Sequence, residues 1–347
     1  MGALQPGRRF VGGTHGDIIQ NPYNSPKRPG EQDYLVSSTE LKPQCAGAYT
    51  VVLRPKSVMK KPYRLCYAHR GGLLMPKHQE RLLKETAFHD AIAEKIEING
   101  DLLQKLQHYD SPAAYSANRL PRLKSRLYQL LGDLTDSHVL VYGCGNDSAA
   151  IWFAKAGANV DAIDISPKSI ENQKLIAAKT GVKINAFVMD AHRLEFPSNR
   201  YDIVYGNAIL HHLEIEKAAG EIHRVLKPGG KGIFRDVMKG NLFLQAFRFF
   251  TPFWRTPHEH PLTNNDFALL NKKFLKCEID QYILSSLPYL FLARIMNNVI
   301  FRRMRLKIRI PTPDSIYANM DKIDCLLFRL MPFLKKQAWL CLVALTK

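Results

Sequence analysis

The sequence predicts an α/β fold in which helices flank a mostly parallel, doubly wound sheet. Between residues 139 and 237, short apolar runs alternate with segments of helical length, and the connections are short. This alternation requires parallel strands with helical crossovers. The glycine turn Gly143-Cys-Gly145 ends the first apolar run, and Asp164 ends the second. Glycines let the backbone approach a ligand, and an acid about twenty residues later can bind ribose, so the pattern predicts a nucleotide-binding βαβ unit.

The remaining elements follow in order along the chain. Strands are expected at 139–142, 159–164, 183–189, 201–205 and 231–237, and helices at 148–156, 167–179 and 214–226. Ser166 is a suitable N-cap for the second helix, and Pro167 suits its first turn. Two further strands are expected at 274–282 and 339–345, which would complete the sheet.

The flanks of this pattern differ from it in composition. We expect an irregular arm at 1–45, a basic extension with a helix at 46–109, a core at 110–282, a basic helical insertion at 283–336 and the last core strand at 337–347. The helix of the extension covers 79–107, with a break at Asn99-Gly100. Residues 241–254 predict a helix rich in aromatic side chains, which would belong to the core or line an apolar pocket.

From residue 139 to 230 the chain resembles the class I S-adenosylmethionine (SAM)-dependent methyltransferases, and within them the small-molecule branch. The resemblance rests on the glycine turn with Asp164, on Met189-Asp-Ala-His192, on the segment 201–213 and on the segment 221–230. It implies a Rossmann-like seven-stranded sheet, SAM as the cofactor, and methyl transfer to oxygen or carbon of an apolar or lipid-like small molecule.

The resemblance also implies which residues bind SAM. They are Gly143, Cys144, Gly145, Asp164, Ile165, Asp190, Ala191 and Asn207. In this interpretation Asp164 binds both ribose hydroxyls, and Asp190 accepts from the adenine amino group. The ammonium group would meet the carbonyl or the side chain of Asn207.

Two positions depart from the pattern of the family. Val141 stands where an acid usually precedes the first glycine, and Asp147 stands where a third glycine is usual. Both lie next to the expected position of the amino-acid part of SAM. They leave a second interpretation open, a SAM-binding pseudoenzyme that acts through interactions.

His211 and His212 are the candidate catalytic residues, because they follow the fourth strand, where related small-molecule enzymes face their substrate. A histidine suits proton removal from a hydroxyl near neutral pH. Cys144 is interpreted as a small buried filler rather than a nucleophile. His258, Glu259 and His260 share one polar loop, which is weak evidence for a metal, and none is expected.

The net charge of +18 lies mainly before residue 138 and after residue 240. Such charge fits an anionic membrane surface, a solvated face or nucleic acid. Arginines interleaved with apolar residues at 289–310 favour a membrane surface. The sequence contains no run of about 20 apolar residues, so no membrane-spanning helix is expected. An RNA-modifying methyltransferase remains an alternative, although Gly206-Asn-Ala-Ile209 lacks the prolines typical of base-amino methyltransferases. Six scattered cysteines favour a reducing compartment, so we expect a cytoplasmic protein, with possible peripheral contact on the inner face of a membrane.

Overall fold

The computed structural model describes residues 34–37, 48–55, 63–68, 77–107, 120–242, 244–245, 248, 259–285 and 314–347. The chain divides into two compact units, Met1–Pro76 and Lys77–Lys347. In the first unit, β1 (Tyr34–Ser37), β2 (Ala48–Pro55) and β3 (Tyr63–Ala68) form an antiparallel sheet. The expectation of an irregular arm therefore fails at β1, which pairs with β2.

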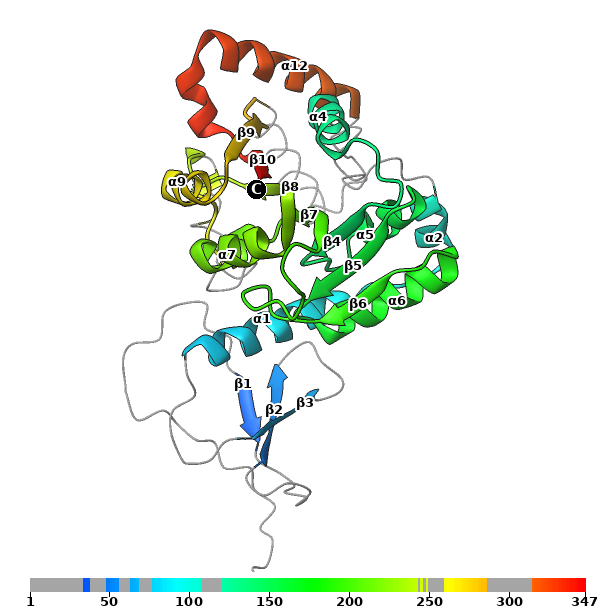
Figure 1. Ribbon diagram of the computed structural model, residues 1–347. Helices are drawn as coiled ribbons and strands as arrows, with labels where there is room; N and C mark the ends of the chain where they lie inside the picture. Colours follow the sequence, from blue (N-terminus) through cyan, green and yellow to red (C-terminus); the bar gives the residue numbers. More distant parts are fainter. Residues whose placement is uncertain are drawn as a thin grey trace, which may run out of the picture. The chain divides into compact units, whose positions relative to one another are not determined.

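The second unit is built on a seven-stranded sheet with the strand order β6-β5-β4-β7-β8-β10-β9 (Figure 1). Its strands are β4 (His138–Tyr142), β5 (Asn159–Asp164), β6 (Asn185–Val188), β7 (Tyr201–Asn207), β8 (Leu226–Val237), β9 (Lys276–Tyr282) and β10 (Leu340–Thr346). All neighbouring pairs from β6 to β8 are parallel, and β10 runs antiparallel to both β8 and β9. The prediction of a seven-stranded Rossmann-like sheet is confirmed.

The helices of this unit cover both faces of the sheet (Figure 1). They are α1 (Lys77–Ala93), α2 (Gly100–Gln107), α4 (Pro121–Leu131), α5 (Ala149–Lys155), α6 (Pro167–Thr180), α7 (Ile215–Val225), α9 (Asn264–Lys273) and α12 (Asp314–Leu330), with the 3-10 helices η1 (Leu210–His212) and η4 (Pro332–Gln337). Ser166 caps α6 by accepting from Ser169 N, as predicted. Between α1 and α2, Asn99 lies at the start of α2, where its Oδ1 accepts from Leu102 N at 3.0 Å.

Alternate residues of β4 point into two separate hydrophobic clusters. Leu140 and Tyr142 pack in one cluster with residues of α7 and α9, whereas Val139 and Val141 pack in the other with residues of α4 and α5. This follows from the period of two in a strand. Val141 is 2% exposed, so its apolar side chain belongs to the core of the sheet.

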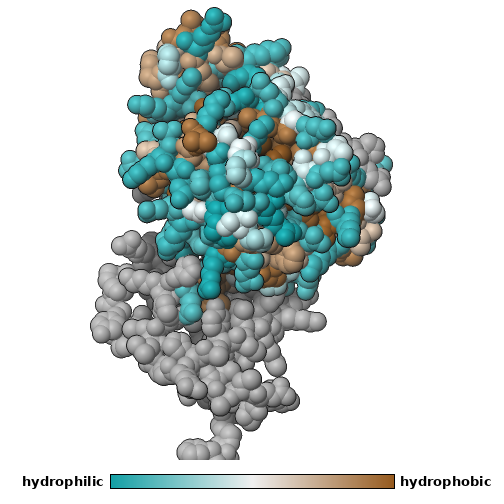
Figure 2. Space-filling view, in the orientation of Figure 1, coloured by the Kyte–Doolittle hydropathy of each residue, from teal (hydrophilic) through white to brown (hydrophobic). Residues whose placement is uncertain are grey.

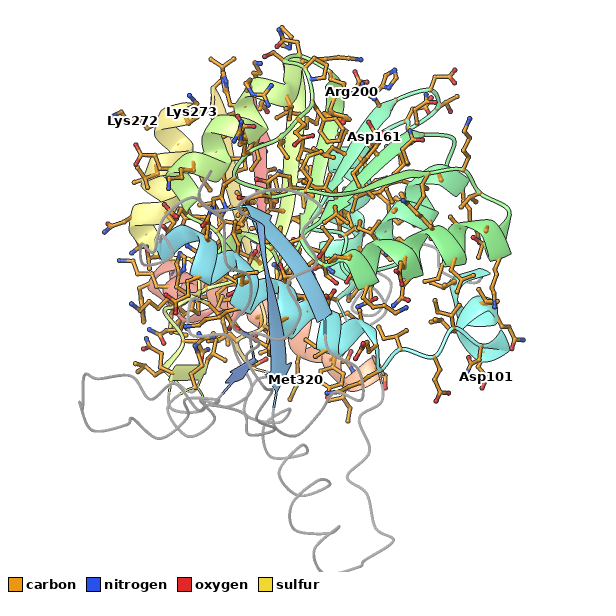
Figure 3. All side chains as sticks on the ribbon, turned by 90° about the horizontal axis from the view of Figure 1, so that it is seen from below. Asp101, Asp161, Arg200, Lys272, Lys273 and Met320 are labelled. Carbon is orange, nitrogen blue, oxygen red and sulfur yellow. The ribbon has the colours of Figure 1, made fainter. Side chains whose placement is uncertain are left out.

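An ion pair joins the loop before β7 to β5 at the amino ends of the parallel strands. Arg200 lies 2.8 Å from the Asp161 carboxylate of β5, and the two side chains meet in Figure 3. The hydroxyl of Tyr201 donates to the same carboxylate at 2.8 Å. The carboxyl ends are therefore left to build the site.

Helix α12 is joined to the end of β9 by a buried acid. The two carboxylate oxygens of Asp324 accept from Leu284 N and Ser285 N, each at 2.8 Å. Asp321 accepts from the Arg122 guanidinium at 3.1 Å, which joins α12 to α4. The arginines at 289–310 and all the aromatic side chains at 241–254 lie outside the described residues. Among the described helices, none is long and apolar enough to cross a bilayer.

The boundary between the units differs from the predicted one. The compact second unit begins at Lys77, so α1 and α2 belong with the sheet and not with the basic extension. Asp90 of α1 explains the attachment of this helix, because its carboxylate accepts from Ser166 Oγ and from Lys168 N at the start of α6.

Candidate functional site

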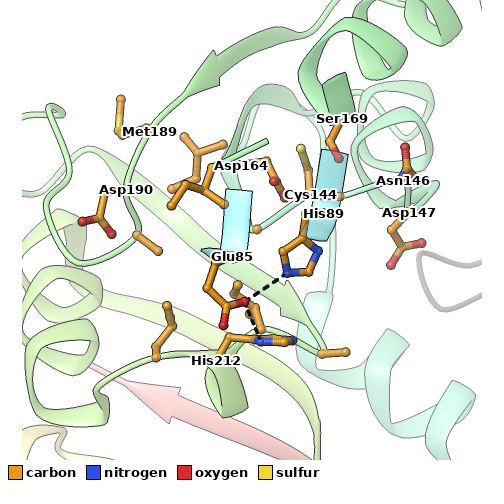
Figure 4. A pocket seen from close by; sticks show the side chains of 18 of the residues that line it. Glu85, His89, Cys144, Asn146, Asp147, Asp164, Ser169, Met189, Asp190 and His212 are labelled. Carbon is orange, nitrogen blue, oxygen red and sulfur yellow. Dashed lines mark hydrogen bonds and ion pairs between the residues drawn. The ribbon is translucent and has the colours of Figure 1, made fainter. Parts of the chain in front are cut away.

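A cavity of about 310 Å³ lies at the carboxyl ends of β4, β5 and β7 (Figure 4). Ligands of open α/β sheets bind in this crevice. The cavity is lined by all eight residues predicted to bind the cofactor and by His212. Helix α1 supplies a further wall, whose residues the sequence interpretation did not name.

The glycine turn brings the backbone to the edge of the cavity. Gly143 has φ +70°, and a Cβ atom there would lie 2.6 Å from two side-chain carbons of Ile209. Gly143 is therefore required both by its conformation and by its contact. Cys144 is 1% exposed, and burial raises the pKa of its thiol well above the usual value, which supports the interpretation as a filler.

Asp164 is held against this turn by main-chain donors. Its carboxylate accepts from Gly145 N at 2.7 Å and from Ser166 N at 2.8 Å. Burial nevertheless raises the pKa of Asp164, since it outweighs these hydrogen bonds. Ile165 follows it along the wall of the cavity. A carboxylate fixed in this way can bind a pair of hydroxyl groups.

The segment after β6 lines another part of the cavity. Asp190 accepts from the main chain of His192 at 2.9 Å, and its carboxylate lies 2.9 Å from His192 Nδ1. His192 Nε2 accepts from Glu214 N at 3.0 Å, so Nδ1 is the ring nitrogen that can donate to Asp190. Ala191 is joined to the sheet below, because its carbonyl accepts from the Tyr142 hydroxyl.

The side chain of Asn207 is occupied by its neighbours. Its amide donates to the Asp147 carboxylate, and its Oδ1 accepts from Arg235 Nε at 2.6 Å. Asp147 also accepts from Ser148 N at 2.6 Å. Burial raises the pKa of Asp147, although Asn207 and Arg235 oppose this shift. The sequence offered the carbonyl or the side chain of Asn207 as a contact for the ammonium group of SAM. The side chain is already hydrogen-bonded, and the Asp147 carboxylate borders the cavity beside it.

The two candidate catalytic histidines have different surroundings. His212 lines the cavity, whereas His211 is absent from its lining and lies 2.6 Å from Asp236 of β8. Burial lowers the pKa of His212, and the neighbouring His211 lowers it further, while Glu85 opposes both. His212 is therefore neutral near pH 7 and faces the space where a ligand would lie.

Helix α1 contributes the residues that sequence reasoning missed. Arg81, Glu85 and His89 lie on one face of this helix at a spacing of four and border the cavity together with Ile92 and Ile96. Glu85 is 6% exposed. The spacing of four was a visible signal, but nothing in the sequence placed this face over the glycine turn.

The predicted polar loop packs behind His211. His260 N donates to the His211 carbonyl at 2.8 Å, and Glu259 pairs with Arg248 at 2.7 Å. His258 lies outside the described residues.

Comparison with known proteins agrees with this geometry. A family model described as a methyltransferase domain matches residues 140–234. A sterol 4-C-methyltransferase of Caenorhabditis elegans is 27% identical over 177 residues, covering 44% of this chain and 53% of its own length. An uncharacterized methyltransferase of Synechocystis is 30% identical over 138 residues, covering 38% of this chain and 63% of its own.

A third relative, a ubiquinone biosynthesis O-methyltransferase of Rickettsia conorii, is 27% identical over 165 residues, covering 44% of this chain and 56% of its own length. The chain thus spans little more than half the length of the relatives it matches. The matched segment contains the glycine turn, Asp164, Asp190 and Asn207, all of which line the cavity. The segment 140–234 therefore matches the methyltransferase-domain family and carries the SAM-binding pattern of its class I members.

Proposed function

We propose that this protein transfers the methyl group of SAM to oxygen or carbon of an apolar small molecule. The observation that carries the proposal is the single cavity wall formed by the glycine turn, Asp164, Asp190 and Asn207, which continues into an apolar space under α1. Bound SAM supplies a methyl group activated by its sulfonium. The protein's task is alignment and exclusion of water.

The cavity residues fit this cofactor. Gly143 and Gly145 present bare backbone at the edge of the cavity, against which the methionine part can lie. Asp164 accepts hydrogen bonds from the ribose hydroxyls, and Asp190 accepts from the adenine amino group. Asp147 offers its carboxylate to the ammonium, which compensates for the apolar Val141.

The proposed acceptor is mainly apolar because Leu82, Ile92 and Ile96 of α1 line the remaining wall together with Ile209 and Leu213. Arg81, Glu85 and His89 of the same helix add polar groups to this wall. His212 lines this wall and is the candidate catalytic side chain. The name of one relative refers to a sterol and that of another to ubiquinone biosynthesis. Sterols and ubiquinone are apolar molecules.

The test uses SAM with a tritiated methyl group and extract of the host cells. We expect label in the lipid fraction with the wild-type protein and none with Asp164→Asn. Label in RNA would favour the alternative RNA-modifying enzyme. Binding of SAM by titration without label in any fraction would favour a SAM-binding protein that acts through interactions.

We also propose that α12 and η4 bind the anionic surface of a cytoplasmic membrane. Buried Tyr317, Asp321, Asp324 and Phe328 fix one face of α12, and an apolar stripe is exposed on another. The stripe consists of Ile323, Leu326, Leu330 and Phe333, which are 50%, 56%, 67% and 66% exposed. Figure 2 displays hydrophobic residues at the top of the view, where Figure 1 places α12.

Basic residues complement this stripe. Lys322, Arg329, Lys335 and Lys336 are all exposed around it. Apolar side chains that enter the headgroup region, with cations that meet anionic lipid, are the usual composition of an interfacial helix. Cys144, Cys277, Cys325 and Cys341 are free, which suits the cytoplasm. The surface would bring the enzyme to an acceptor dissolved in lipid.

Flotation with vesicles of phosphatidylcholine and phosphatidylserine tests this surface. We expect the wild-type protein to float and the Leu326→Gln, Leu330→Gln, Phe333→Gln variant to stay in solution. Leu269→Gln, which changes an exposed leucine of α9, is the matched control and should float. Equal flotation of both variants would exclude the α12 surface.

A further inference from the structure

Three side chains that can bind a metal meet at the wall of the cavity. Glu85 and His89 lie one turn apart on α1, and His212 approaches them from η1 (Figure 4). Glu85 Oε2 lies 3.6 Å from His89 Nε2 and 3.4 Å from His212 Nδ1. One ligand atom from each residue lies within 4.8 Å of the other two.

We propose that Glu85, His89 and His212 bind a divalent transition metal ion of the zinc type. Two imidazoles and one carboxylate are a ligand set that zinc takes in catalytic sites, where it keeps a position for water or substrate. All three residues line the cavity, so the remaining position faces the proposed acceptor space.

A ligand atom of the cluster is available to a cation. His212 Nδ1 is buried and makes no hydrogen bond with any described residue, although it lies 3.4 Å from Glu85 Oε2. Glu85, which is 6% exposed, brings a carboxylate to the same place.

The surroundings hold the ligands in place. The Arg81 guanidinium donates to the His212 carbonyl, and His212 N donates to the Ile209 carbonyl at 3.0 Å. The positive charge of Arg81 is directed to Glu214, whose carboxylate lies 3.6 Å away. The rings of His89 and His212 meet edge to face with centroids 5.2 Å apart. Such outer contacts orient metal ligands.

A second group, His211 with His212 and Glu259, has the same spacing but is already engaged. His211 Nδ1 is bonded to Asp236 at 2.6 Å, and Glu259 is paired with Arg248 at 2.7 Å. An ion there would have to displace Asp236 or compete with a guanidinium. The metal is therefore assigned to the group on α1.

The role of the ion rests on the proposed function. A hydroxyl of the acceptor takes the open position and releases its proton to solvent, because a bound cation lowers the pKa of that hydroxyl. The oxygen lone pair then forms the new bond to the methyl carbon, while the bond from carbon to sulfur breaks and its electron pair stays on sulfur. This assigns the acceptor to hydroxyl-bearing apolar molecules.

The experiment titrates the untagged, chelator-treated full chain with Zn²⁺ and with Co²⁺. We expect one ion per chain, and we expect Glu85→Gln and His89→Asn each to weaken binding by about 100-fold or more, since even outer contacts contribute 10–100-fold. His138→Asn, an exposed histidine outside the cavity, and Glu259→Gln are matched controls that should bind as the wild type does.

Two results would overturn the metal site. One is wild-type affinity in the Glu85→Gln and His89→Asn variants, with their folding checked by thermal unfolding. The other is a thiolate band in the spectrum of bound Co²⁺, which would place the ion at cysteines. A parallel titration with SAM separates this inference from the proposed function, because loss of SAM binding with retained Zn²⁺ would contradict only the latter.

Discussion

His211 Nδ1 lies 2.6 Å from the Asp236 carboxylate, and both side chains are buried. Burial disfavours both charges, but their mutual attraction and hydrogen bonds outweigh it, so the pKa of His211 is raised above 6.5 and that of Asp236 is lowered below 3.8. The ionised form of the pair is therefore favoured over its neutral form. Its positive charge helps to keep the adjacent His212 neutral.

We expect this pair to make stability depend on pH. The contribution of His211 is complete below its unfolded pKa of about 6.5 and is lost as the pH rises through its folded pKa. That of Asp236 is present above about 3.8 and is lost as the pH falls through its folded pKa. In urea unfolding, His211→Gln should lower the free energy of unfolding near pH 6 by about 3–5 kcal/mol, because it leaves a buried charge.

The matched comparison is the double variant His211→Gln, Asp236→Asn, which leaves no charge and should recover part of the loss. An unchanged slope of stability between about pH 6 and 9 in His211→Gln would contradict the assignment.

Asp147 should determine affinity for the amino-acid part of SAM. Asp147→Asn removes the carboxylate proposed to bind the ammonium and should weaken SAM binding about tenfold, or about 1.4 kcal/mol. Binding of 5′-methylthioadenosine, which lacks the amino-acid part, should not change. Asp164→Asn should weaken both ligands, since the proposed ribose contact is common to them. Calorimetric titration measures all four affinities, and equal losses for both ligands in Asp147→Asn would refute its role.

Gly143 should tolerate no side chain. Gly143→Ala combines a left-handed backbone, worth about 1–2 kcal/mol, with a clash against Ile209, worth about 1–3 kcal/mol. Gly181 has nearly the same φ of +71° but open space around its Cβ position, so Gly181→Ala isolates the backbone cost. Ile209→Ala in the Gly143→Ala background should remove the steric part. Chemical denaturation measures the differences, and similar losses at residues 143 and 181 would show that the contact costs nothing.

Asp324 should anchor α12. Asp324→Ala leaves the main-chain N–H groups of Leu284 and Ser285 without their acceptor and should reduce the free energy of unfolding by about 2–4 kcal/mol. Lys322→Ala, on the exposed side of the same helix, should change it by less than about 0.5 kcal/mol. Comparable effects of the two changes would mean that α12 is held by other contacts.

The sequence was sufficient to predict the sheet and the cofactor-binding wall of the cavity, because the patterns that indicate them lie within short segments of the chain. Gly143 and Gly145 follow β4, Asp164 ends β5, and adjacent parallel strands place their ends together. Asn207 was found, but its partner Arg235 was not, although the two are opposite each other in the register of β7 and β8.

The opposite wall could not be predicted, because it depends on contacts between distant segments. Glu85 and His212 are more than a hundred residues apart, and the amphipathic pattern of α1 says only that one face is buried. The different directions of His211 and His212 were also beyond the sequence. They lie in a 3-10 turn, where neither the period of a strand nor that of an α-helix assigns a side chain to a face.

The position of α1 has a consequence for comparing and engineering such proteins. The matched segment begins at residue 140, yet Glu85, His89 and the apolar residues around them border the same cavity. Similarity over 140–234 thus indicates which cofactor donates the methyl group, but it says little about the acceptor molecule. A fragment or chimaera that starts at β4 would keep the cofactor half and exchange the specificity half. Selectivity is better sought by varying residues 81–96 than by varying the glycine turn.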